Sequence, residues 1–378
     1  MSRGGVLSDA LQGCAVVIAV DRRSGELTAA LERHGAQVRQ AAALTIVPHI
    51  DDTALLARTR ELIVDPPDIV VVTTGVGFRG WIDAALEAGL DEELTAALAD
   101  ARFVARGPKA RGAIQQAGFV ADWVAESETS SDLGDYLIAQ GVRGRRIVVQ
   151  HHGAGADGLD EAFAAAGADV VSLTVYRWGP PADPEAVRRT VRQVADGEVD
   201  AVLFTSAPGA AQWLIEAADA GVLADIRRRS VAGRMLLAAV GPVTAAPLAD
   251  AGLMTLTAER GRLGSLVRLV VGYFGGPGGR TAPRLRTAAG VLQLRSGGAV
   301  LDGRFVPLSR AGVSLLGALF DAAGDVVSRA QLLDVLPRSS GDDHAVEMAV
   351  ARVREAIGAG VIKTVIKRGY RLDLEEDA

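Results

Sequence analysis

The chain has a single cysteine, and this scarcity limits the chemistry that the sequence can support. One thiol cannot form an internal disulfide, which is typical of proteins in a reducing cytosol. Because Cys14 begins the apolar run "CAVVIAV", we expect a small buried residue there and not a nucleophile. No further cysteine or carboxylate cluster accompanies His151 and His152, which as neighbours in a strand would point to opposite faces. We therefore expect no metal site.

Long hydrophobic runs and a strong excess of one charge are also lacking. The run after Cys14 is too short to span a membrane, and no small-residue cleavage site follows it. The sequence therefore predicts no membrane partner and no secretory signal, and we expect a cytoplasmic location. The balance of 40 basic and 46 acidic residues does not by itself indicate nucleic acid, so a charged partner must be recognised by local clusters.

Internal repetition dominates the part of the chain before residue 275. A chain of 378 residues is too long for one ordinary core, which favours two or three domains. The stretch "DIVVVTTGVGFRGWIDAALEAG" at 68–89 aligns without a gap with "DAVLFTSAPGAAQWLIEAADAG" at 200–221. Further on, Gly107-Pro108 matches Gly241-Pro242. A period this long indicates a duplicated domain and not a solenoid.

Each copy alternates short β-branched runs with amphipathic stretches that end in glycine. Runs such as "DIVVVTT" and "RIVVQ" are typical of buried parallel strands. The glycines that follow the amphipathic stretches stand where a left-handed C-cap is expected; they are Gly35, Gly89, Gly167 and Gly221. Strand–helix alternation predicts parallel sheets covered on both faces. We therefore predict an α/β fold with two doubly wound lobes over residues 14–275.

The character of the sequence changes near residue 276. The segment "GGPGGRTAPRLRTAAG" at 275–290 is rich in glycine and proline, so we expect a linker over 276–290. Strand-like pieces, three helical stretches and a closing pair of strands follow. The predicted helix at 344–357 has one apolar stripe, formed by Val346, Val350, Val353 and Ile357. This stripe must face a core, which leaves the opposite face for a partner.

Four features together resemble the uroporphyrinogen-III synthase (HemD) family. They are the two lobes, the "FTS" turn, "VGPVTAAPLADAG" at 240–252 and "VYR" at 175–177. The resemblance spans nearly all of residues 14–275. It implies a HemD-like domain over 1–275 with a bilobed fold in which the chain crosses twice between lobes. Lobe 1 would comprise 14–44 and 175–275, and lobe 2 would comprise 48–172, with hinge strands near 44–48 and 172–176. The family substrate is hydroxymethylbilane, a linear tetrapyrrole edged with carboxylates, and its cyclisation needs no cofactor.

The turns after the repeated strands are the expected ligand site, one in each lobe and facing across a cleft. Free N–H groups at a helix N-terminus attract anions, and nearby hydroxyls can donate to carboxylates. The residues expected to hold the ligand are Thr73, Thr74, Gly75, Thr205, Ser206 and Ala207. The resemblance adds Thr244 to this set and gives Tyr176 the catalytic place, assisting loss of the terminal hydroxyl. Each hydroxyl is alternatively a helix cap, and Tyr176 is alternatively a packing residue of the hinge.

Two further observations bear on this site. "GVGFRG" at 75–80 matches a dinucleotide fingerprint, but its partner copy keeps only Gly209, so we do not expect nucleotide binding. Ala110 stands where the family commonly has threonine and supplies no hydroxyl. This departure leaves open whether the domain catalyses the reaction.

The motifs "VVSRAQLL", "AVEMAVARVREAIG" and "IKTVIKRGYRL" resemble the output domain of OmpR/PhoB-type response regulators. The resemblance implies an α+β winged-helix DNA-binding domain over 291–378. The helix at 344–357 would then enter the major groove, and the following hairpin would be the wing. The expected base-facing residues are His344, Met348 and Arg352, the expected phosphate contact at the flank is Arg354, and the expected wing residues are Lys363, Thr364, Lys367 and Arg368. A winged helix that docks a protein is the alternative.

The two resemblances together predict a transcription regulator that binds promoter DNA and senses a tetrapyrrole or another polyanionic small molecule. Another transcription regulator or RNA polymerase is a further possible partner. Because uroporphyrinogen III leads to sirohaem, we expect the targets among nitrogen or sulfur assimilation or tetrapyrrole genes. The alternative is an active uroporphyrinogen-III synthase, a cyclising hydro-lyase, or a bifunctional protein.

Overall fold

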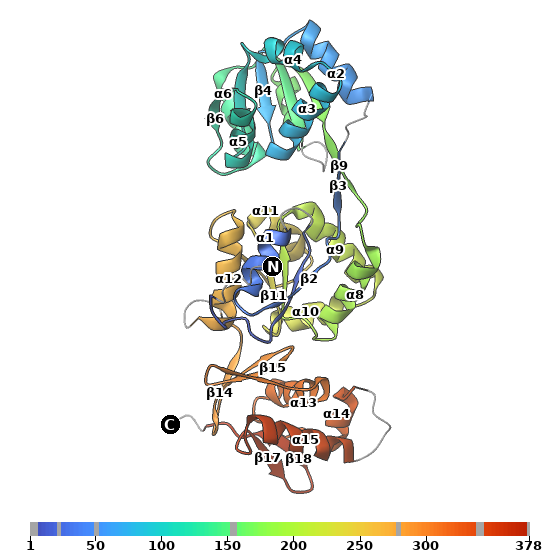
Figure 1. Ribbon diagram of the computed structural model, residues 1–378, viewed down its shortest axis with the longest axis vertical. Helices are drawn as coiled ribbons and strands as arrows, with labels where there is room; N and C mark the ends of the chain where they lie inside the picture. The colour runs from blue at the N-terminus through green and yellow to red at the C-terminus, as the bar shows by residue number, and fades with distance from the viewer. Residues whose placement is uncertain are drawn as a thin grey trace, which may run out of the picture. The chain divides into compact units, whose positions relative to one another are not determined.

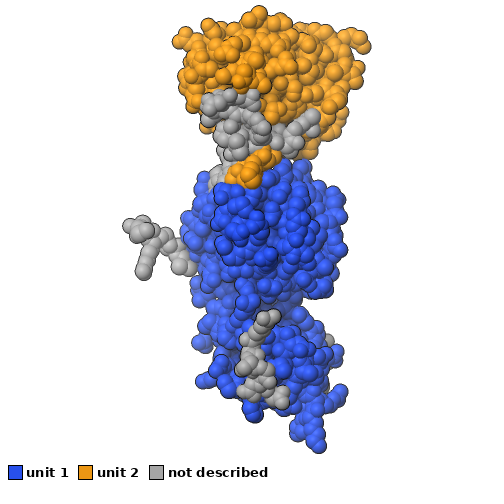
Figure 2. Space-filling model, turned by 90° about the vertical axis from the view of Figure 1, so that its right-hand side faces the viewer, with its two compact units in different colours: residues 1–44, 181–378 blue, residues 45–180 orange. Residues whose placement is uncertain are grey.

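The computed structural model describes residues 7–20, 24–48, 53–151, 157–276, 281–337 and 344–375. The chain divides into two compact units, residues 1–44 with 181–378 and residues 45–180 (Figure 2). The first unit holds one α/β lobe, called lobe 1 below, and the C-terminal domain. The second unit is the other α/β lobe, called lobe 2. None of the helices in the described ranges is long and apolar enough to cross a membrane.

Lobe 1 is a five-stranded parallel sheet with helices on both faces (Figure 1). Its strands in spatial order are β12 (Thr255–Thr257), β11 (Leu236–Ala239), β10 (Ala201–Phe204), β1 (Ala15–Ile18) and β2 (Gln37–Gln40). Its helices are α1 (Ser24–Glu32), α8 (Pro184–Ala195), α9 (Ala207–Asp219), α10 (Leu223–Val231), α11 (Pro242–Asp250) and α12 (Leu263–Gly275). Successive strand residues face opposite sides, so Val16 packs with the α1 and α12 side chains and Val17 with those of α8 and α9.

Lobe 2 has the same spatial order of equivalent strands, which explains the repeat in the sequence. Its strands in spatial order are β6 (Ala121–Val124), β5 (Arg102–Ala105), β4 (Ile69–Val72), β7 (Arg146–His151) and β8 (Asp169–Thr174). Its helices are α2 (Thr53–Val64), α3 (Gly75–Glu87), α4 (Asp91–Leu98), α5 (Pro108–Gln116), α6 (Ser130–Gln140) and α7 (Leu159–Ala165). Trp81 and Trp213, which the repeat pairs, are both fully buried. The doubly wound α/β prediction is thereby confirmed.

A short antiparallel pair lies outside the two parallel sheets. β3 (Thr45–Pro48) pairs with β9 (Tyr176–Gly179), and Pro48 stands opposite Tyr176. We expected the second of these strands at 172–176. It begins later because residues up to Thr174 continue β8 and pair with β7 as far as His151.

The C-terminal domain has the predicted winged-helix-like fold. A four-stranded antiparallel sheet is formed by β13 (Arg284–Thr287), β14 (Gly290–Arg295), β15 (Gly298–Leu301) and β16 (Arg304–Pro307). Three helices and a hairpin follow, namely α13 (Arg310–Asp321), α14 (Arg329–Val335), α15 (His344–Ile357), β17 (Ile362–Val365) and β18 (Gly369–Leu372). Ser309 and Ser328 cap α13 and α14 through their hydroxyls. β13 falls within the segment 276–290, where we expected a linker.

Candidate functional site

Each lobe has a turn at the carboxyl end of its central strand, the edge at which parallel α/β sheets bind ligands. β4 leads through Thr73 and Thr74 into α3, and β10 leads through Thr205 and Ser206 into α9. The Thr74 and Ser206 hydroxyls each accept the N–H of the third helical residue, at 3.2 Å. Both hydroxyls therefore act as helix caps in the structure. The amides of Gly75 and Ala207, at the first helical position, have no partner within their own helix.

The turn of lobe 2 is largely engaged by a side chain that the sequence analysis missed. Gln150 is fully buried at the end of β7, and its Oε1 accepts the Thr74 N–H at 3.2 Å. The buried Thr73 hydroxyl donates to the Gln150 carbonyl oxygen at 2.7 Å. Gly75 is covered by α5, since a Cβ there would lie 2.2 Å from the Lys109 carbonyl oxygen. The only sign of Gln150 in the sequence was a polar residue at the end of an apolar strand.

The turn of lobe 1 lacks this arrangement. The register of β1 and β10 places Ala19 where lobe 2 has Gln150, and a methyl group cannot accept an amide hydrogen. Thr205, Ser206 and Ala207 are all partly exposed, whereas Thr73 and Gly75 are buried. The two turns are therefore not equivalent, and that of lobe 1 is the more accessible.

Thr244 lies on the helix next to this turn. It is the third residue of α11, which follows β11 and packs beside α9. Because β10 and β11 are neighbouring parallel strands, the starts of α9 and α11 lie at the same edge of the sheet. The structure therefore brings Thr244 to the same edge as Ser206, although Thr244 is only 6% exposed. Tyr176 begins β9, but its side chain lies outside what the structure describes, and its catalytic role stays a prediction.

His151 is held within lobe 2 by two carboxylates. Its Nε2 lies 2.9 Å from both oxygens of Asp160, and its Nδ1 lies 3.7 Å from an oxygen of Asp157. Burial would raise the pKa of Asp160, but the hydrogen bond and charge of His151 hold that pKa below its ordinary value. His152 lies outside the described residues. His151 is thus part of an internal network at the end of β7.

Replacing Asp160 with asparagine will lower the free energy of unfolding at neutral pH by roughly 1–2 kcal/mol, because a charged hydrogen bond is lost. Since the pKa of Asp160 is lowered in the folded state, its stabilisation is complete above about pH 4 and is lost as the pH falls through the folded value. Thermal unfolding between pH 3 and 7 measures this difference. Asp135→Asn, an exposed change on α6, is the control. A difference that stays constant down to pH 3 would contradict this account.

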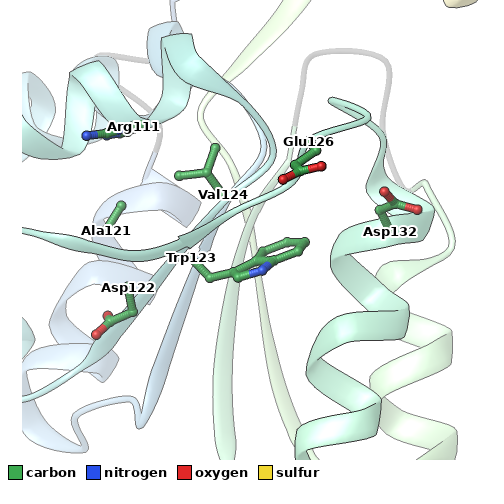
Figure 3. A pocket seen from close by; sticks show the side chains of 7 residues that line it. All are labelled: Arg111, Ala121, Asp122, Trp123, Val124, Glu126 and Asp132. Carbon is green, nitrogen blue, oxygen red and sulfur yellow. The ribbon is translucent and has the colours of Figure 1, made fainter.

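A depression of about 590 Å³ runs along the edge strand β6 of lobe 2 (Figure 3). Arg111 lies on one side of it, and Glu126 and Asp132 lie on the other. Trp123 also lines it, and the Trp123 ring stacks on Tyr136 at a centroid distance of 4.0 Å. Three of its seven lining residues are acidic, which disfavours a polycarboxylate ligand. This depression is therefore not the expected ligand site, and it is remote in sequence from both turns.

The C-terminal domain presents most of the predicted nucleic-acid-binding residues to solvent. The apolar stripe of α15 is buried, and His344, Met348 and Arg352 are exposed on its outer face. Each is one helical turn from the next, so the three lie in one row. The wing residues Lys363, Thr364, Lys367 and Arg368 are exposed as well. Lys367 has a φ of 62°, the left-handed conformation of a tight turn between β17 and β18.

Arg354 differs from the other predicted residues because it braces the wing. Its guanidinium donates to the Ile362 carbonyl oxygen at 2.8 and 3.1 Å and to the Thr364 hydroxyl at 2.9 Å. It also lies over the Tyr370 ring, 6.0 Å from the centroid. The predicted phosphate contact would therefore come from a side chain that already ties α15 to β17.

Comparisons with known proteins agree with this division of the chain. A family model described as "Uroporphyrinogen-III synthase HemD" matches residues 25–268, and one described as "Transcriptional regulatory protein, C terminal" matches residues 303–372. The chain is similar to the uncharacterized protein YjjA of Bacillus subtilis (strain 168), with 28% identity over 271 residues, 70% of this chain and 97% of YjjA. It is also similar to a putative uroporphyrinogen-III synthase of Methanothermobacter thermautotrophicus, with 29% identity over 157 residues, 41% of this chain and 59% of that protein.

Among solved structures, a mutant uroporphyrinogen III synthase from the extremely thermophilic bacterium Thermus thermophilus is similar, with a TM-score of 0.55 and 29% sequence identity. The match covers 68% of this chain and 97% of that one. The matching region of this chain therefore corresponds to almost the whole length of the solved protein.

Proposed function

Because the chain belongs to the uroporphyrinogen-III synthase HemD family and carries a transcriptional regulatory domain after its HemD domain, we propose that it is a promoter-binding regulator controlled by a polyanionic ligand. The observation that carries this proposal is the fusion itself. A domain of the HemD family, whose substrate is a carboxylate-edged tetrapyrrole, occupies the place that a receiver holds in two-domain response regulators. The expected ligand is a tetrapyrrole or a small molecule of similar charge.

The exposed face of α15 and the cationic wing support DNA as the partner of the C-terminal domain. Arg352 projects from α15, while Lys363, Lys367 and Arg368 project from the hairpin. Arginine can read a guanine edge with two hydrogen bonds, and wing cations neutralise phosphates without reading sequence. These local charges favour DNA although the chain as a whole carries a net charge of −6.

The state of the two turns argues against turnover. In lobe 2 the Thr73 hydroxyl and the Thr74 amide are both bonded to Gln150, so a ligand would have to displace these contacts. In lobe 1 the turn is partly exposed, but Pro208 removes one of the helix-start N–H groups. Fewer free donors remain to stabilise a reacting substrate than two open turns would offer.

Electrophoretic mobility shifts on promoter fragments test the proposal. We expect binding to fragments upstream of tetrapyrrole or nitrogen and sulfur assimilation genes, and an affinity that changes when hydroxymethylbilane or uroporphyrinogen III is added. A protein that binds none of the fragments, with or without either compound, would exclude DNA as the partner. DNA binding whose affinity neither compound changes would support a transcription regulator but would exclude a tetrapyrrole as its ligand.

Catalysis is the second candidate function, because the match covers 97% of the solved synthase. Incubation with hydroxymethylbilane and separation of the two uroporphyrinogen isomers measures it. We expect isomer III at no more than the level formed without protein, since Ala110 and the engaged Thr73 hydroxyl leave the site short of donors. A clear excess of isomer III would make the protein a synthase, and a bifunctional one if it also binds DNA.

A further inference from the structure

Asp200 lies between lobe 1 and the C-terminal domain. It directly precedes β10, at the opposite end of that strand from the Thr205–Ala207 turn. Its Oδ1 accepts the Ser296 N–H at 2.8 Å, and its Oδ2 accepts the Ala15 N–H at 2.8 Å. The Ser296 hydroxyl donates to the same Oδ2. Since Ser296 lies in the turn between β14 and β15, one carboxylate holds both a strand of lobe 1 and a turn of the C-terminal domain.

The residues on either side of Ser296 also bond to lobe 1. Arg295 is only 5% exposed, and its guanidinium donates to the Gln12 carbonyl oxygen at 2.6 Å and to that of Phe274 at 3.4 Å. The Gly297 N–H donates to the Gly13 carbonyl oxygen at 2.9 Å. Three consecutive residues, the last of β14 and two of the turn after it, therefore meet lobe 1, mostly through its backbone. Such a set of directed bonds defines one orientation of the two parts more sharply than apolar contact does.

Two ion pairs and one ring contact also join lobe 1 to the C-terminal domain. Arg234 of lobe 1 bonds Asp321 of α13 at 2.6 Å and lies 5.1 Å from the centroid of the Phe320 ring. Arg310, at the start of α13, bonds Glu198 of lobe 1 at 2.5 Å. These pairs have exposed members and contribute little energy each, but their opposite charges favour a single arrangement.

The internal repeat supplies a natural comparison for Asp200. Its counterpart in lobe 2, Asp68, accepts the Arg146 N–H at 2.8 Å, just as Asp200 accepts that of Ala15. The second oxygen of Asp68 faces Arg145 at 2.9 Å, and the side chains of Asp68 and Arg145 are 38% and 59% exposed. The aspartate thus has a shared role inside each lobe, and within the described ranges only that of lobe 1 bonds a residue of another domain.

The pKa shifts of the two aspartates reflect this difference. Burial raises the pKa of Asp200 despite its hydrogen bonds, whereas the Arg146 N–H lowers that of the partly exposed Asp68. A buried carboxylate is costly unless donors surround it, so the bonds from Ser296 are needed where Asp200 lies. A non-specific contact between the two domains would bury the Asp200 carboxylate without supplying the donors that Ser296 provides.

We propose that the amino-terminal edge of the lobe 1 sheet is a docking surface for the DNA-binding domain, with Asp200 as its central contact. The two parts then move together, and the DNA-binding domain does not turn freely on the segment after α12. This holds whether or not lobe 1 binds a ligand. If it does, the ligand turn and the docking contact are the two ends of the same four-residue strand.

The test compares Asp200→Asn with Asp68→Asn in the full chain. Both oxygens of Asp200 accept a backbone N–H, so an asparagine NH2 group faces a donor in either orientation. At Asp68 the amide can turn its NH2 toward the exposed Arg145, which can move away. Amide hydrogen exchange read by mass spectrometry over residues 292–300 reports whether the β14–β15 turn has left lobe 1.

We expect exchange of the Ser296 and Gly297 amides to become at least about tenfold faster in Asp200→Asn and to stay unchanged in Asp68→Asn, with α15 equally protected in both. Unchanged exchange in Asp200→Asn would overturn the proposal. If that variant also loosens β1 and β10, Ser296→Ala decides, since it leaves the Ala15 bond in place. Faster exchange at Gly297 in Ser296→Ala supports the docking surface, and unaltered exchange refutes it.

Discussion

Alanine at position 352 will lower the affinity for a specific promoter site by about tenfold to a hundredfold, the effect of losing one two-bond contact to a base. Arg352 is exposed on α15, one turn from Met348 and two from His344, while the opposite stripe of the helix is buried. The loss will be smaller on unrelated sequence, because a base contact adds nothing there. Fluorescence anisotropy titrations on the specific site and on a shuffled duplex measure both.

Lys367→Gly is the matched control for Arg352→Ala. Lys367 has a φ of 62°, so glycine removes the charge without the backbone strain that alanine would keep. Its loss will weaken binding equally on both duplexes and reduce the salt dependence by about one phosphate contact. If both variants bound as tightly as the parent protein, the assignment of α15 to the groove and of the hairpin to the wing would be wrong.

Arg354→Ala will destabilise the wing, which is the second large effect. Three hydrogen bonds from its guanidinium reach Ile362 and Thr364, and the Ile362 carbonyl oxygen would lose both of its Arg354 donors. Bonds to a charged group contribute about 1.5–3 kcal/mol each when buried, and partial exposure of Arg354 reduces the total to roughly 2–3 kcal/mol. Hydrogen exchange of the β17 and β18 amides will rise accordingly, and DNA affinity will fall with it.

Arg354→Lys and Arg368→Ala separate bracing from phosphate contact. Lysine keeps the charge but cannot form the forked bonds to Ile362, so it will restore little of the wing's protection. Arg368 is exposed, so its loss will change DNA affinity and leave exchange of the wing unaltered. Should Arg354→Ala lower only the salt dependence of binding and leave exchange unchanged, Arg354 would be the phosphate contact that the sequence predicted.

The fold could be predicted closely because its signals are local or periodic. Alternating apolar runs and glycine-terminated helices indicated parallel sheets, and the repeat from Asp68 to Gly89 indicated two lobes of one topology. The stripe of Val346, Val350 and Val353 was enough to orient α15, because a 3.6-residue period leaves only one face for the core. The roles of individual site residues were harder to predict from the sequence, because a hydroxyl that follows a strand can either cap a helix or bind a ligand.

The amino-acid sequence by itself determined the duplication, the α/β and winged-helix architectures and the outward face of the last helix. Only the tertiary structure decided how residues at corresponding positions of the two lobes differ in their contacts. Gln150 engages the turn of lobe 2 where lobe 1 has Ala19, and Asp200 bonds Ser296 of another domain where Asp68 bonds the exposed Arg145 of its own lobe. The physical reason is separation along the chain. Periodicity relates residues a few positions apart, whereas the Gln150–Thr74 and Asp200–Ser296 contacts join residues 76 and 96 positions apart, which only the folded chain brings together.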